Sequence, residues 1–397
     1  MKYRLDKYNN KLSILGLGCM RFPKQFGKTD MKATETLITE AIAGGINYFD
    51  TAYIYGDSEI VLGKILKAKE LREKIYLATK LPFTFWRDKE QFEKCLNSQL
   101  KRLQTDYIDY YLIHMLTTAE QWQDLCDRGI KTWLKEKQNQ SKIKQIGFSF
   151  HGSQADFLKI LAAYDWDFCQ IQYNYMNENY QAGKTGLKAA HQKGIPVVIM
   201  EPLLGGKLAV KLPKKVNEIF KKANPGLTPA AWALNWLWNQ PEVTLLLSGM
   251  NSLEQLQENL ATASQAEINM LNQKAVKTIN QVVEIFNESY KIPCTGCNYC
   301  IPCPHGVNIP ACFSSYNACY AIGRSQGIKQ YFMSVGMTSS HNGRLQHCIK
   351  CGACEKKCPQ HIEIINNLNL VQKKLEPFWL KWGFNIAEKM MKKNKSH

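Results

Sequence analysis

Residues 44–59 read GGINYFDTAYIYGDSE. A helix-compatible run, residues 36–43, precedes the two glycines, as expected where a helix ends. A short strand-like run, residues 46–49, then ends at the carboxylate of Asp50, and Tyr55 follows in a loop broken by Gly56. Loops after strand ends converge on a cleft in many α/β proteins, so an acid and a phenol here predict a site. The alternative is that Asp50 caps the next helix and Tyr55 is a packed aromatic.

Strand-like and helix-like segments alternate on both sides of this stretch. The predicted strands are residues 14–18, 46–49, 75–79, 107–113, 143–148, 168–173, 197–200 and 244–247. Residues 3–12 predict a preceding hairpin that turns at Asn9-Asn10. Helices are predicted at 91–103 from apolar spacing, at 230–238 after Thr228-Pro229, and after Ser252, which begins a capping box with Gln255. Eight βα units predict an α/β fold, the (β/α)8 TIM barrel, whose active sites lie at the C-terminal strand ends.

Titratable side chains lie at several of these predicted strand ends. Strand two is predicted to end in Asp50, strand three in Lys80 and strand four in His114. Together with Tyr55, four such groups would converge from neighbouring strands. Lys80 alone would be an ordinary strand-end lysine and His114 alone a core histidine, so the prediction depends on the set.

The large N-terminal region resembles the aldo/keto reductase family. The similarity lies in Gly16-Leu17-Gly18-Cys19-Met20, Phe49-Asp50-Thr51-Ala52 with Tyr55-Gly56, Ala78-Thr79-Lys80, Leu112-Ile113-His114, Ile146-Gly147-Phe148-Ser149, Gln170-Ile171-Gln172-Tyr173-Asn174, Pro202-Leu203 and Glu258-Asn259-Leu260. The resemblance implies a TIM barrel that reduces a small carbonyl substrate with NAD(P)H, with Asp50, Tyr55, Lys80 and His114 as catalytic residues.

Residue chemistry suggests a role for each member of this set. A phenol with a pKa near ~10 is too weak an acid at neutral pH, and a neighbouring ammonium such as Lys80 lowers that pKa. Asp50 would hold Lys80 in place and charged. His114 would orient the carbonyl oxygen by a hydrogen bond, and Tyr55 would donate the proton.

The resemblance also implies where the cofactor binds. Ser149 and Gln170 would hold the nicotinamide amide, although the family often has Asn after this Ser and this chain has Phe150-His151. The predicted cofactor-binding residues are Gly18, Cys19, Met20, Asp50, Ser149, Gln170, Leu203, Gly205, Ser248, Gln255, Glu258 and Asn259. Many relatives that prefer NADP place a cation in the last segment, because a 2′-phosphate attracts one. Residues 248–258 contain no Lys or Arg, so the choice between NADH and NADPH stays open.

Cysteines mark a second domain, because ten of the 14 lie within residues 294–358. Cys348-x2-Cys351-x2-Cys354-x3-Cys358-Pro359 matches the bacterial ferredoxin run for a [4Fe–4S] cluster. Cys294-x2-Cys297-x2-Cys300-x2-Cys303-Pro304 is one residue shorter in its last gap. Zinc sites use two CxxC pairs separated by a spacer, so these continuous strings favour iron–sulfur clusters.

Two such strings imply two clusters that exchange their fourth ligand. Cys294, Cys297 and Cys300 would share a cluster with Cys358, and Cys348, Cys351 and Cys354 would share one with Cys303. Cys312 and Cys319 are alternatives to Cys303. The layout resembles the subset of aldo/keto reductases that carry a C-terminal dicluster ferredoxin-type domain, including the stretch Cys-Pro-His-Gly-Val-Asn-Ile-Pro from Cys303. We predict a barrel at 1–289, a mainly helical ferredoxin-like iron–sulfur domain at 290–370 and a basic amphipathic tail at 371–397.

Composition limits the other classes of protein. The net charge is +17, but the basic residues are scattered and accompany no nucleic-acid motif, so we expect no nucleic-acid partner. The start MKYRLDKYNN has no apolar core, and no run is long enough for a transmembrane segment, so we expect a cytoplasmic protein. In the tail, residues 377–393 place apolar residues at helical spacing among lysines. This helix would dock on its own protein, or on a membrane surface or partner.

The favoured hypothesis is a nicotinamide-dependent carbonyl reductase joined to two [4Fe–4S] clusters. Hydride transfer moves two electrons and a cluster carries one, so the clusters are either structural or a link to a ferredoxin- or flavodoxin-like carrier. A flavin normally couples such steps; no motif for one is visible, and its presence stays open. The alternative is an electron-transfer or docking protein whose barrel is not a carbonyl reductase.

Overall fold

The computed structural model describes residues 1–82, 88–210, 212–321, 323–331, 335 and 343–376. It divides into two compact units, Met1–Leu203 with Ala230–Asn272, and Leu204–Pro229 with Gln273–His397. The predicted domain limits at residues 289 and 370 remain predictions. The predicted amphipathic helix at 377–393 lies outside the described residues.

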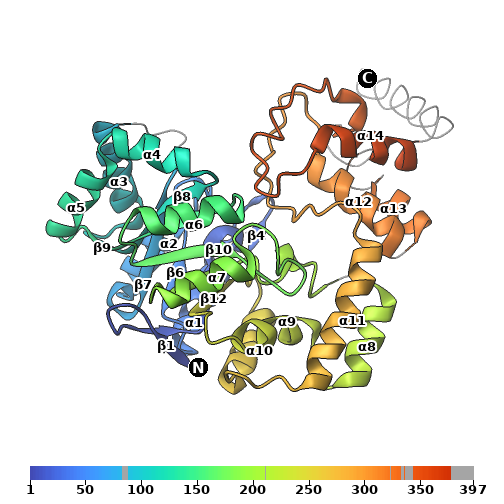
Figure 1. Ribbon diagram of the computed structural model, residues 1–397, viewed down its shortest axis with the longest axis horizontal. Coiled ribbons are helices and arrows are strands. Elements are labelled where there is room, and N and C mark those ends of the chain that lie inside the picture. Colours follow the sequence, from blue (N-terminus) through green and yellow to red (C-terminus); the bar gives the residue numbers. More distant parts are fainter. Residues whose placement is uncertain (83–87, 211, 322, 332–334, 336–342, 377–397) are drawn as a thin grey trace. The chain divides into compact units, whose positions relative to one another are not determined.

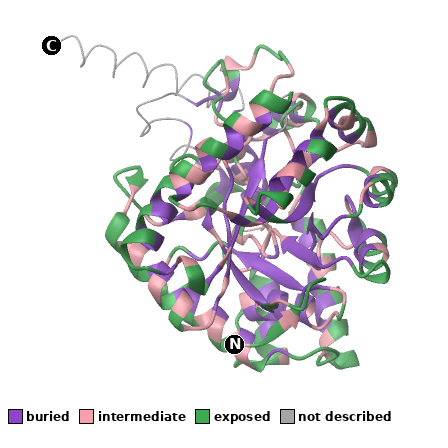
Figure 2. Cartoon of the chain, turned by 90° about the vertical axis from the view of Figure 1, so that its left-hand side faces the viewer, coloured by how far each residue is buried: buried purple, intermediate pink, exposed green. Residues whose placement is uncertain are grey.

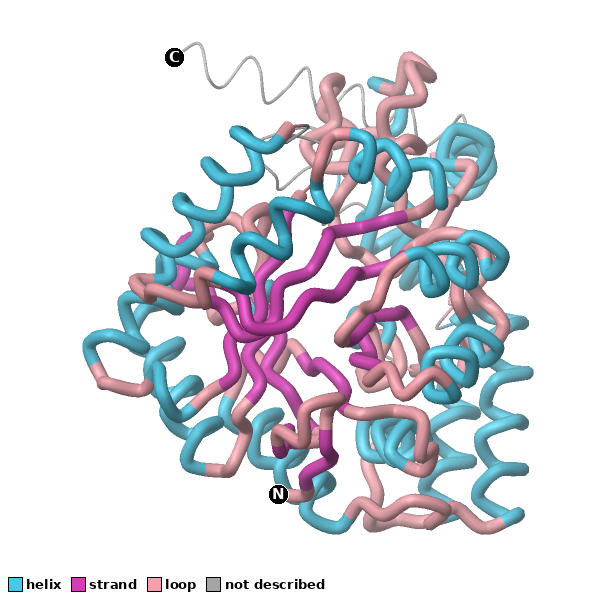
Figure 3. Tube along the Cα trace, turned by 60° about the vertical axis from the view of Figure 1, so that its left-hand side comes forward, coloured by secondary structure: helices cyan, strands magenta, loops and turns pink. Residues whose placement is uncertain are grey.

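Unit one contains a closed barrel of eight parallel strands, which Figure 3 shows as a ring of strands surrounded by helices. Each strand pairs with its neighbour in the barrel, and the last pairs with the first, so the predicted TIM barrel is confirmed. The strands are β3 (Leu15–Gly18), β6 (Tyr48–Asp50), β7 (Tyr76–Leu81), β8 (Ile108–Leu116), β9 (Ile143–Phe150), β10 (Phe168–Gln172), β11 (Val197–Met200) and β12 (Leu245–Ser248).

The barrel strands are buried on both faces, as Figure 2 shows for the interior of the unit. One set of side chains fills the barrel, including Tyr48, Tyr110 and Phe168. The opposite set, including Leu17 and Ile113, packs under the surrounding helices. Parallel strands buried in this way read as continuous apolar runs, which is why all eight were predictable.

Two predicted strand ends are wrong. Lys80 is followed by Leu81 within β7, and His114 lies inside β8, which continues to Leu116. The β8–β9 register shifts between Ile113 and Leu116, and Met115 has a positive φ of 62°. The strand therefore resumes pairing after an irregularity, which apolar patterning does not reveal.

Helices follow the barrel strands, and most predicted ones are confirmed. In unit one they are α1 (Met31–Ala43), α2 (Ser58–Ala68), α3 (Lys89–Leu103), α4 (Ala119–Asp127), α5 (Ile130–Asn139), α6 (Gln154–Ala163), α7 (Gly183–Gln192), α9 (Pro229–Trp238) and α10 (Leu253–Gln265), with 3-10 turns η1 (Cys19–Arg21) and η2 (Arg72–Lys74). The predicted capping box at Ser252 forms only in part. Ser252 accepts from the Gln255 N–H, but the Gln255 side chain accepts from Asn251 N–H instead.

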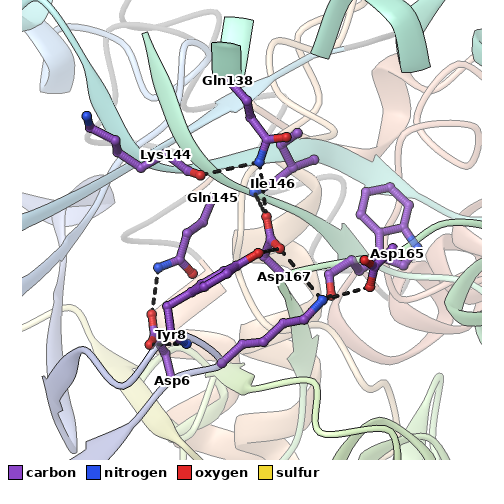
Figure 4. A network of polar contacts seen from close by, with 10 residues as sticks. Asp6, Tyr8, Gln138, Lys144, Gln145, Ile146, Asp165 and Asp167 are labelled. Atoms are coloured by element: carbon purple, nitrogen blue, oxygen red, sulfur yellow. Dashed lines mark hydrogen bonds and ion pairs between the residues drawn. The ribbon is translucent and has the colours of Figure 1, made fainter. Parts of the chain in front are cut away.

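A hairpin closes the barrel at the end opposite the carboxyl ends of its strands. It consists of β1 (Tyr3–Leu5) and β2 (Lys11–Ser13), as predicted, and a second short hairpin joins β4 (Lys24–Gln25) to β5 (Lys28–Thr29). Figure 4 shows how the turn between β1 and β2 is held: Asp6 accepts from Tyr8 N–H at 2.8 Å and from Gln145 Nε2 at 2.6 Å. Tyr110 donates to the same carboxylate at 2.6 Å. This end is filled, which leaves the carboxyl ends of the strands for chemistry.

Unit two is helical in its described part, as Figure 1 shows in yellow-green to red. Its elements are η3 (Leu204–Gly206), α8 (Lys214–Ala223), α11 (Gln273–Ser289), α12 (Ile309–Ala321), α13 (Arg324–Tyr331), η5 (Leu345–His347) and α14 (Ile364–Leu375). Its core comprises apolar residues from α12, α14 and the cysteine-bearing loops, with Phe313 and Val371 fully buried. Along the described parts of the chain, no helix is both long and apolar enough to cross a membrane.

Candidate functional site

The four predicted catalytic side chains lie together at the carboxyl ends of three adjacent strands. Lys80 Nζ is 2.6 Å from Asp50 Oδ1, and it also donates to the Thr51 carbonyl oxygen at 2.7 Å. The same ammonium lies 5.0 Å from the centre of the Tyr55 ring. The His114 ring meets the Tyr55 ring edge-on, with 5.9 Å between centroids. Tyr55 is half-buried, whereas Asp50, Lys80 and His114 are buried.

Burial dominates the electrostatics of this group. It raises the pKa of Asp50 and lowers the pKa of Lys80, and each partner's charge opposes the other's shift. Burial, followed by the positive charge of Lys80, holds the pKa of His114 well below its usual range, so its imidazole is neutral near pH ~7. Within the described residues, His114 Nδ1 and Asp50 Oδ2 have no hydrogen-bond partner. A neutral imidazole carries one ring N–H, which can donate a hydrogen bond to a substrate oxygen.

A buried network behind the strands holds the backbone of β7 at Thr79 and Lys80, and the sequence analysis did not identify it. Glu59, which ends the stretch 44–59, accepts from Thr79 Oγ1 at 2.7 Å and from Gln99 Nε2 at 3.0 Å. The same Gln99 nitrogen lies 3.0 Å from the Lys80 carbonyl oxygen. Tyr111 donates to Gln99 Oε1 at 2.8 Å, which orients the amide. Glu59 directly follows Ser58 at the start of α2, so its position in a helix could be predicted from the sequence. Its hydrogen-bond partners could not.

Ser149 and Gln170 stand side by side on β9 and β10, where they are register partners. Ser149 Oγ accepts from the Met115 N–H at 2.8 Å, which leaves its hydroxyl hydrogen available to donate. Gln170 is buried, and its Oε1 has no hydrogen-bond partner among the described residues. A buried amide oxygen without a partner is costly, so this position fits a ligand that donates a hydrogen bond, such as a carboxamide.

Most other predicted cofactor residues of unit one lie at the ends of β3 and β12 or in the segments that follow them. Gly18 is the register partner of Asp50, and Ser248 that of Leu17. Asn259 Nδ2 donates to Ser248 Oγ at 3.1 Å. Cys19 is buried with its thiol directed to the Leu17 carbonyl, whereas Met20, Gln255 and Glu258 are at least partly exposed.

Two further predicted residues fall on different units of the chain. Leu203 is half-buried and packs on the core of unit one. Gly205 is exposed at the start of unit two, with a φ of 67°. Their predicted role in cofactor binding remains a prediction.

Arg21 is a cation near this segment that the sequence analysis missed. Its Cδ and Cβ lie 3.8 and 3.9 Å from the position that a Cβ on Gly249 would occupy. It is half-buried, and in the described part of the chain its guanidinium has no hydrogen bond or ion pair. Its place directly after Gly18-Cys19-Met20 was a sequence signal, because those residues were already expected to touch the cofactor.

The two cysteine strings of unit two fold alike despite their different last gaps. Gly296 and Lys350, each two residues after a first cysteine, both have positive φ, 70° and 61°. The third residue after each fourth cysteine also has positive φ, 75° at Gly306 and 48° at His361. Gly306 N–H donates to Cys303 O at 2.9 Å, and His361 N–H donates to Cys358 O at 3.1 Å.

The helices that follow these turns repeat the pattern. α12 begins at Ile309 and α14 at Ile364, the same number of residues after Cys303 and Cys358. Cys303 therefore occupies the position that Cys358 occupies in the other string, which favours Cys303 over Cys312 and Cys319 as the fourth cysteine.

Each of two cavities is lined by cysteines from both strings. One, of about 440 Å³ including its open mouth, is lined by Cys300, Cys303, Cys348, Cys351 and Cys354. The other, of about 320 Å³, is lined by Cys294, Cys297, Cys300 and Cys358. Cys312 and Cys319 line neither cavity. In the described residues, no three His, Cys, Asp or Glu side chains gather closely enough for a single ion. Cys300 lines both cavities, and each cavity thus offers the four thiols that a [4Fe–4S] cluster requires.

Comparison with known proteins identifies both parts of the chain. The model described as "Aldo/keto reductase family" matches residues 14–284, and the model described as "4Fe-4S dicluster domain" matches residues 293–363. A Schizosaccharomyces pombe relative, "Aldo-keto reductase yakc [NADP(+)]", is 25% identical over 291 residues, covering 63% of this chain and 84% of the relative. The Bacillus subtilis relative "Uncharacterized oxidoreductase YrpG" is 27% identical over 326 residues, covering 70% and 94%.

Solved structures show the same barrel. An aldo-keto reductase from Bacillus halodurans, AKR11C1 in its holo form, matches with a TM-score of 0.59 and 24% identity, covering 71% of this chain and 96% of that one. An aldo/keto reductase from Klebsiella pneumoniae, in complex with NADP and acetate, matches with a TM-score of 0.58 and 22% identity, covering 71% and 95%.

Proposed function

Because this chain belongs to the aldo/keto reductase family and carries a C-terminal 4Fe-4S dicluster domain, we propose that it transfers hydride between a nicotinamide cofactor and a carbonyl or alcohol substrate. One observation carries the proposal: the Lys80 ammonium lies between the Asp50 carboxylate and the ring of Tyr55, with His114 beside the same ring. A structural ion pair would need neither the phenol nor the imidazole.

In the reductive direction, the carbonyl oxygen would lie near Tyr55 and His114. The neutral His114 would hydrogen-bond to that oxygen and orient it. Tyr55 would donate its phenolic proton as negative charge develops there, and the Lys80 ammonium would stabilise the phenolate left behind. Asp50 would keep Lys80 charged and in place. The bound nicotinamide supplies hydride, so one carbonyl, one reduced cofactor and one proton give one alcohol and one oxidised cofactor.

Ser149 and Gln170 are the residues we assign to the nicotinamide amide. The unpartnered Gln170 Oε1 would accept from the amide nitrogen, and the Ser149 hydroxyl would donate to the amide oxygen. We place the phosphates near the ends of β3 and β12, where Arg21 supplies positive charge. No strong preference for NADPH over NADH is expected, since residues 248–258 contain no cation.

The eight cysteines of the two strings would hold two [4Fe–4S] clusters, which supply one-electron chemistry when bound. We propose the crossed ligand sets that line the two cavities, and that the clusters exchange electrons with a ferredoxin- or flavodoxin-like carrier. Such clusters and 14 cysteines without a disulfide suit a reducing compartment, which supports a cytoplasmic location.

The test compares Tyr55→Phe with Tyr53→Phe. Both changes remove one hydroxyl, but the Tyr53 ring stacks under Arg102 at 4.0 Å and belongs to no proposed step. With NADPH and para-nitrobenzaldehyde as probes, Tyr55→Phe should lower kcat by about 10²- to 10⁴-fold, the usual contribution of a general acid. Cofactor binding, followed by fluorescence quenching, should be unchanged in both variants. If Tyr55→Phe kept most of its turnover, the assignment would be wrong.

A further inference from the structure

The two cysteine-lined cavities differ in how far they open to solvent. Cys351, on the first cavity, is exposed, whereas the other described cysteines are buried or half-buried. Ile349, which lines the same cavity, is 63% exposed, a large value for an apolar side chain without a partner. All four cysteines of the second cavity are half-buried.

The surroundings of the two cavities also differ in charge. Lys350, Lys356 and Lys357 are exposed next to the first cavity, and Lys357 lines it. Within residues 343–376, none of these three ammonium groups takes part in a hydrogen bond or ion pair. The acid in the same loop, Glu355, is engaged with the Ile365 N–H at 2.8 Å. Residues 294–303, which carry the first string, contain no charged side chain.

We propose that Ile349, Lys350, Cys351, Lys356 and Lys357, here named the basic port, form the docking surface for an acidic one-electron carrier protein. The inference rests on the proposed function and adds which of the two metal sites faces the carrier. Three exposed lysines that form no ion pair with a described residue, against one acid in the same loop, attract an acidic partner and speed its encounter. Ile349 supplies an exposed apolar contact beside them. Small patches of this kind are typical of electron-transfer complexes.

Docking at the basic port brings the carrier to the exposed ligand Cys351. Cys303, Cys348, Cys351 and Cys354 would hold a cluster there, and that cluster would accept one electron from the reduced carrier. The carrier would lose one electron and the cluster would gain one, so no further reactant is needed. At the second site, Lys207 donates to the Cys294 carbonyl oxygen, and all four cysteines are less exposed than Cys351. Exposure of the ligand therefore favours the first site for the carrier.

The experiment uses the full chain, purified anaerobically, and an acidic plant-type [2Fe–2S] ferredoxin as the probe. Binding is measured by calorimetry at low and at physiological ionic strength. The double variant Lys350→Glu/Lys357→Glu should weaken binding by at least about tenfold, and the loss should shrink at higher salt. A matched control, Lys32→Glu/Lys64→Glu, changes the same net charge on exposed positions of α1 and α2. This control should bind like the unmodified protein.

Visible absorption and reduction by dithionite would show that both variants retain their clusters. The inference is overturned if the unmodified protein does not bind the ferredoxin at low salt, or if both double variants lose binding equally. It is also overturned if vesicles of anionic lipid bind with the same dependence on Lys350 and Lys357, because the port would then be a membrane contact. Carbonyl reduction is assayed separately. Turnover without ferredoxin binding refutes the port alone, and binding without turnover refutes the proposed function alone.

Discussion

Replacing Lys80 with Met should destabilise the barrel through the charge left on Asp50. The two side chains are buried, with 0% and 4% of their side-chain surfaces exposed, and their atoms lie 2.6 Å apart. Removing one partner of a buried ion pair typically costs about 3–5 kcal/mol, because the other charge stays buried without compensation. Asp50 Oδ2 already lacks a hydrogen-bond partner among the described residues, so no other described group takes over from Lys80.

The pH dependence of the stability of Lys80→Met separates the effect of the Asp50 charge from other effects of the substitution. Burial raises the pKa of Asp50 and Lys80 opposes that shift, so Lys80→Met leaves the folded-state pKa further above the unfolded value of ~3.9. A raised carboxyl pKa means that the folded state binds more protons. Stability is therefore retained below the unfolded pKa and lost as the pH rises through the folded pKa, with a slope of up to about 1.4 kcal/mol per pH unit between them.

The assay compares Lys80→Met with Lys80→Met/Asp50→Asn, which differ only at the titrating carboxyl. Urea unfolding is followed by tryptophan fluorescence under anaerobic conditions, since Trp122, Trp133, Trp166 and Trp238 are buried in unit one. At about pH 8 the single variant should be less stable than the double by about 2–4 kcal/mol. The gap should narrow towards about pH 5.5 as Asp50 takes up a proton. A gap that is absent or independent of pH would refute the account of the pair.

Two other substitutions test the assignments at the cofactor and cluster sites. Cys358→Ser should lower the iron content from about eight to about four atoms per chain, because the cluster shared with Cys294 is lost. The control Cys126→Ser, in the barrel, should keep all of the about eight iron atoms. Loss of only the cluster held by Cys348, Cys351 and Cys354 would exclude the crossed ligands. Arg21→Met should weaken NADH and NADPH binding alike by about tenfold, ~1.4 kcal/mol, in fluorescence titrations. A loss confined to NADPH would place Arg21 at the 2′-phosphate and contradict the expected lack of preference.

The barrel was predictable because its strands are buried on both faces and so read as uninterrupted apolar runs. The grouping of Asp50, Tyr55, Lys80 and His114 was predictable, because the resemblance to a family covered each of their motifs in order. The position of His114 within β8 was not, since the positive φ of Met115 and the following register shift depend on pairing with β9. Apolar periodicity contains no information on such an irregularity.

Contacts between segments that are distant in the sequence could not be predicted either. Glu59 and Gln99 meet around Thr79 only because α2 and α3 pack beside the same strand. Arg21 approaches Gly249 because β3 and β12 are neighbours in the closed barrel, at opposite ends of the sequence of unit one. The equivalence of Cys303 and Cys358 became clear from the matching turns after each cysteine, where spacing alone had raised doubt.

The most direct test of hydride transfer at the site of Tyr55, Lys80 and His114 traces deuterium from the nicotinamide. The protein is incubated anaerobically with NADPH deuterated at the transferred position and with para-nitrobenzaldehyde, and the alcohol is analysed by mass spectrometry. Direct transfer predicts one deuterium on the carbinol carbon of each product molecule, with formation strongly reduced in Tyr55→Phe and unaffected in Tyr53→Phe. Alcohol formed without deuterium would mean that the electrons travel through the clusters or another carrier, and would contradict the proposed function of the barrel.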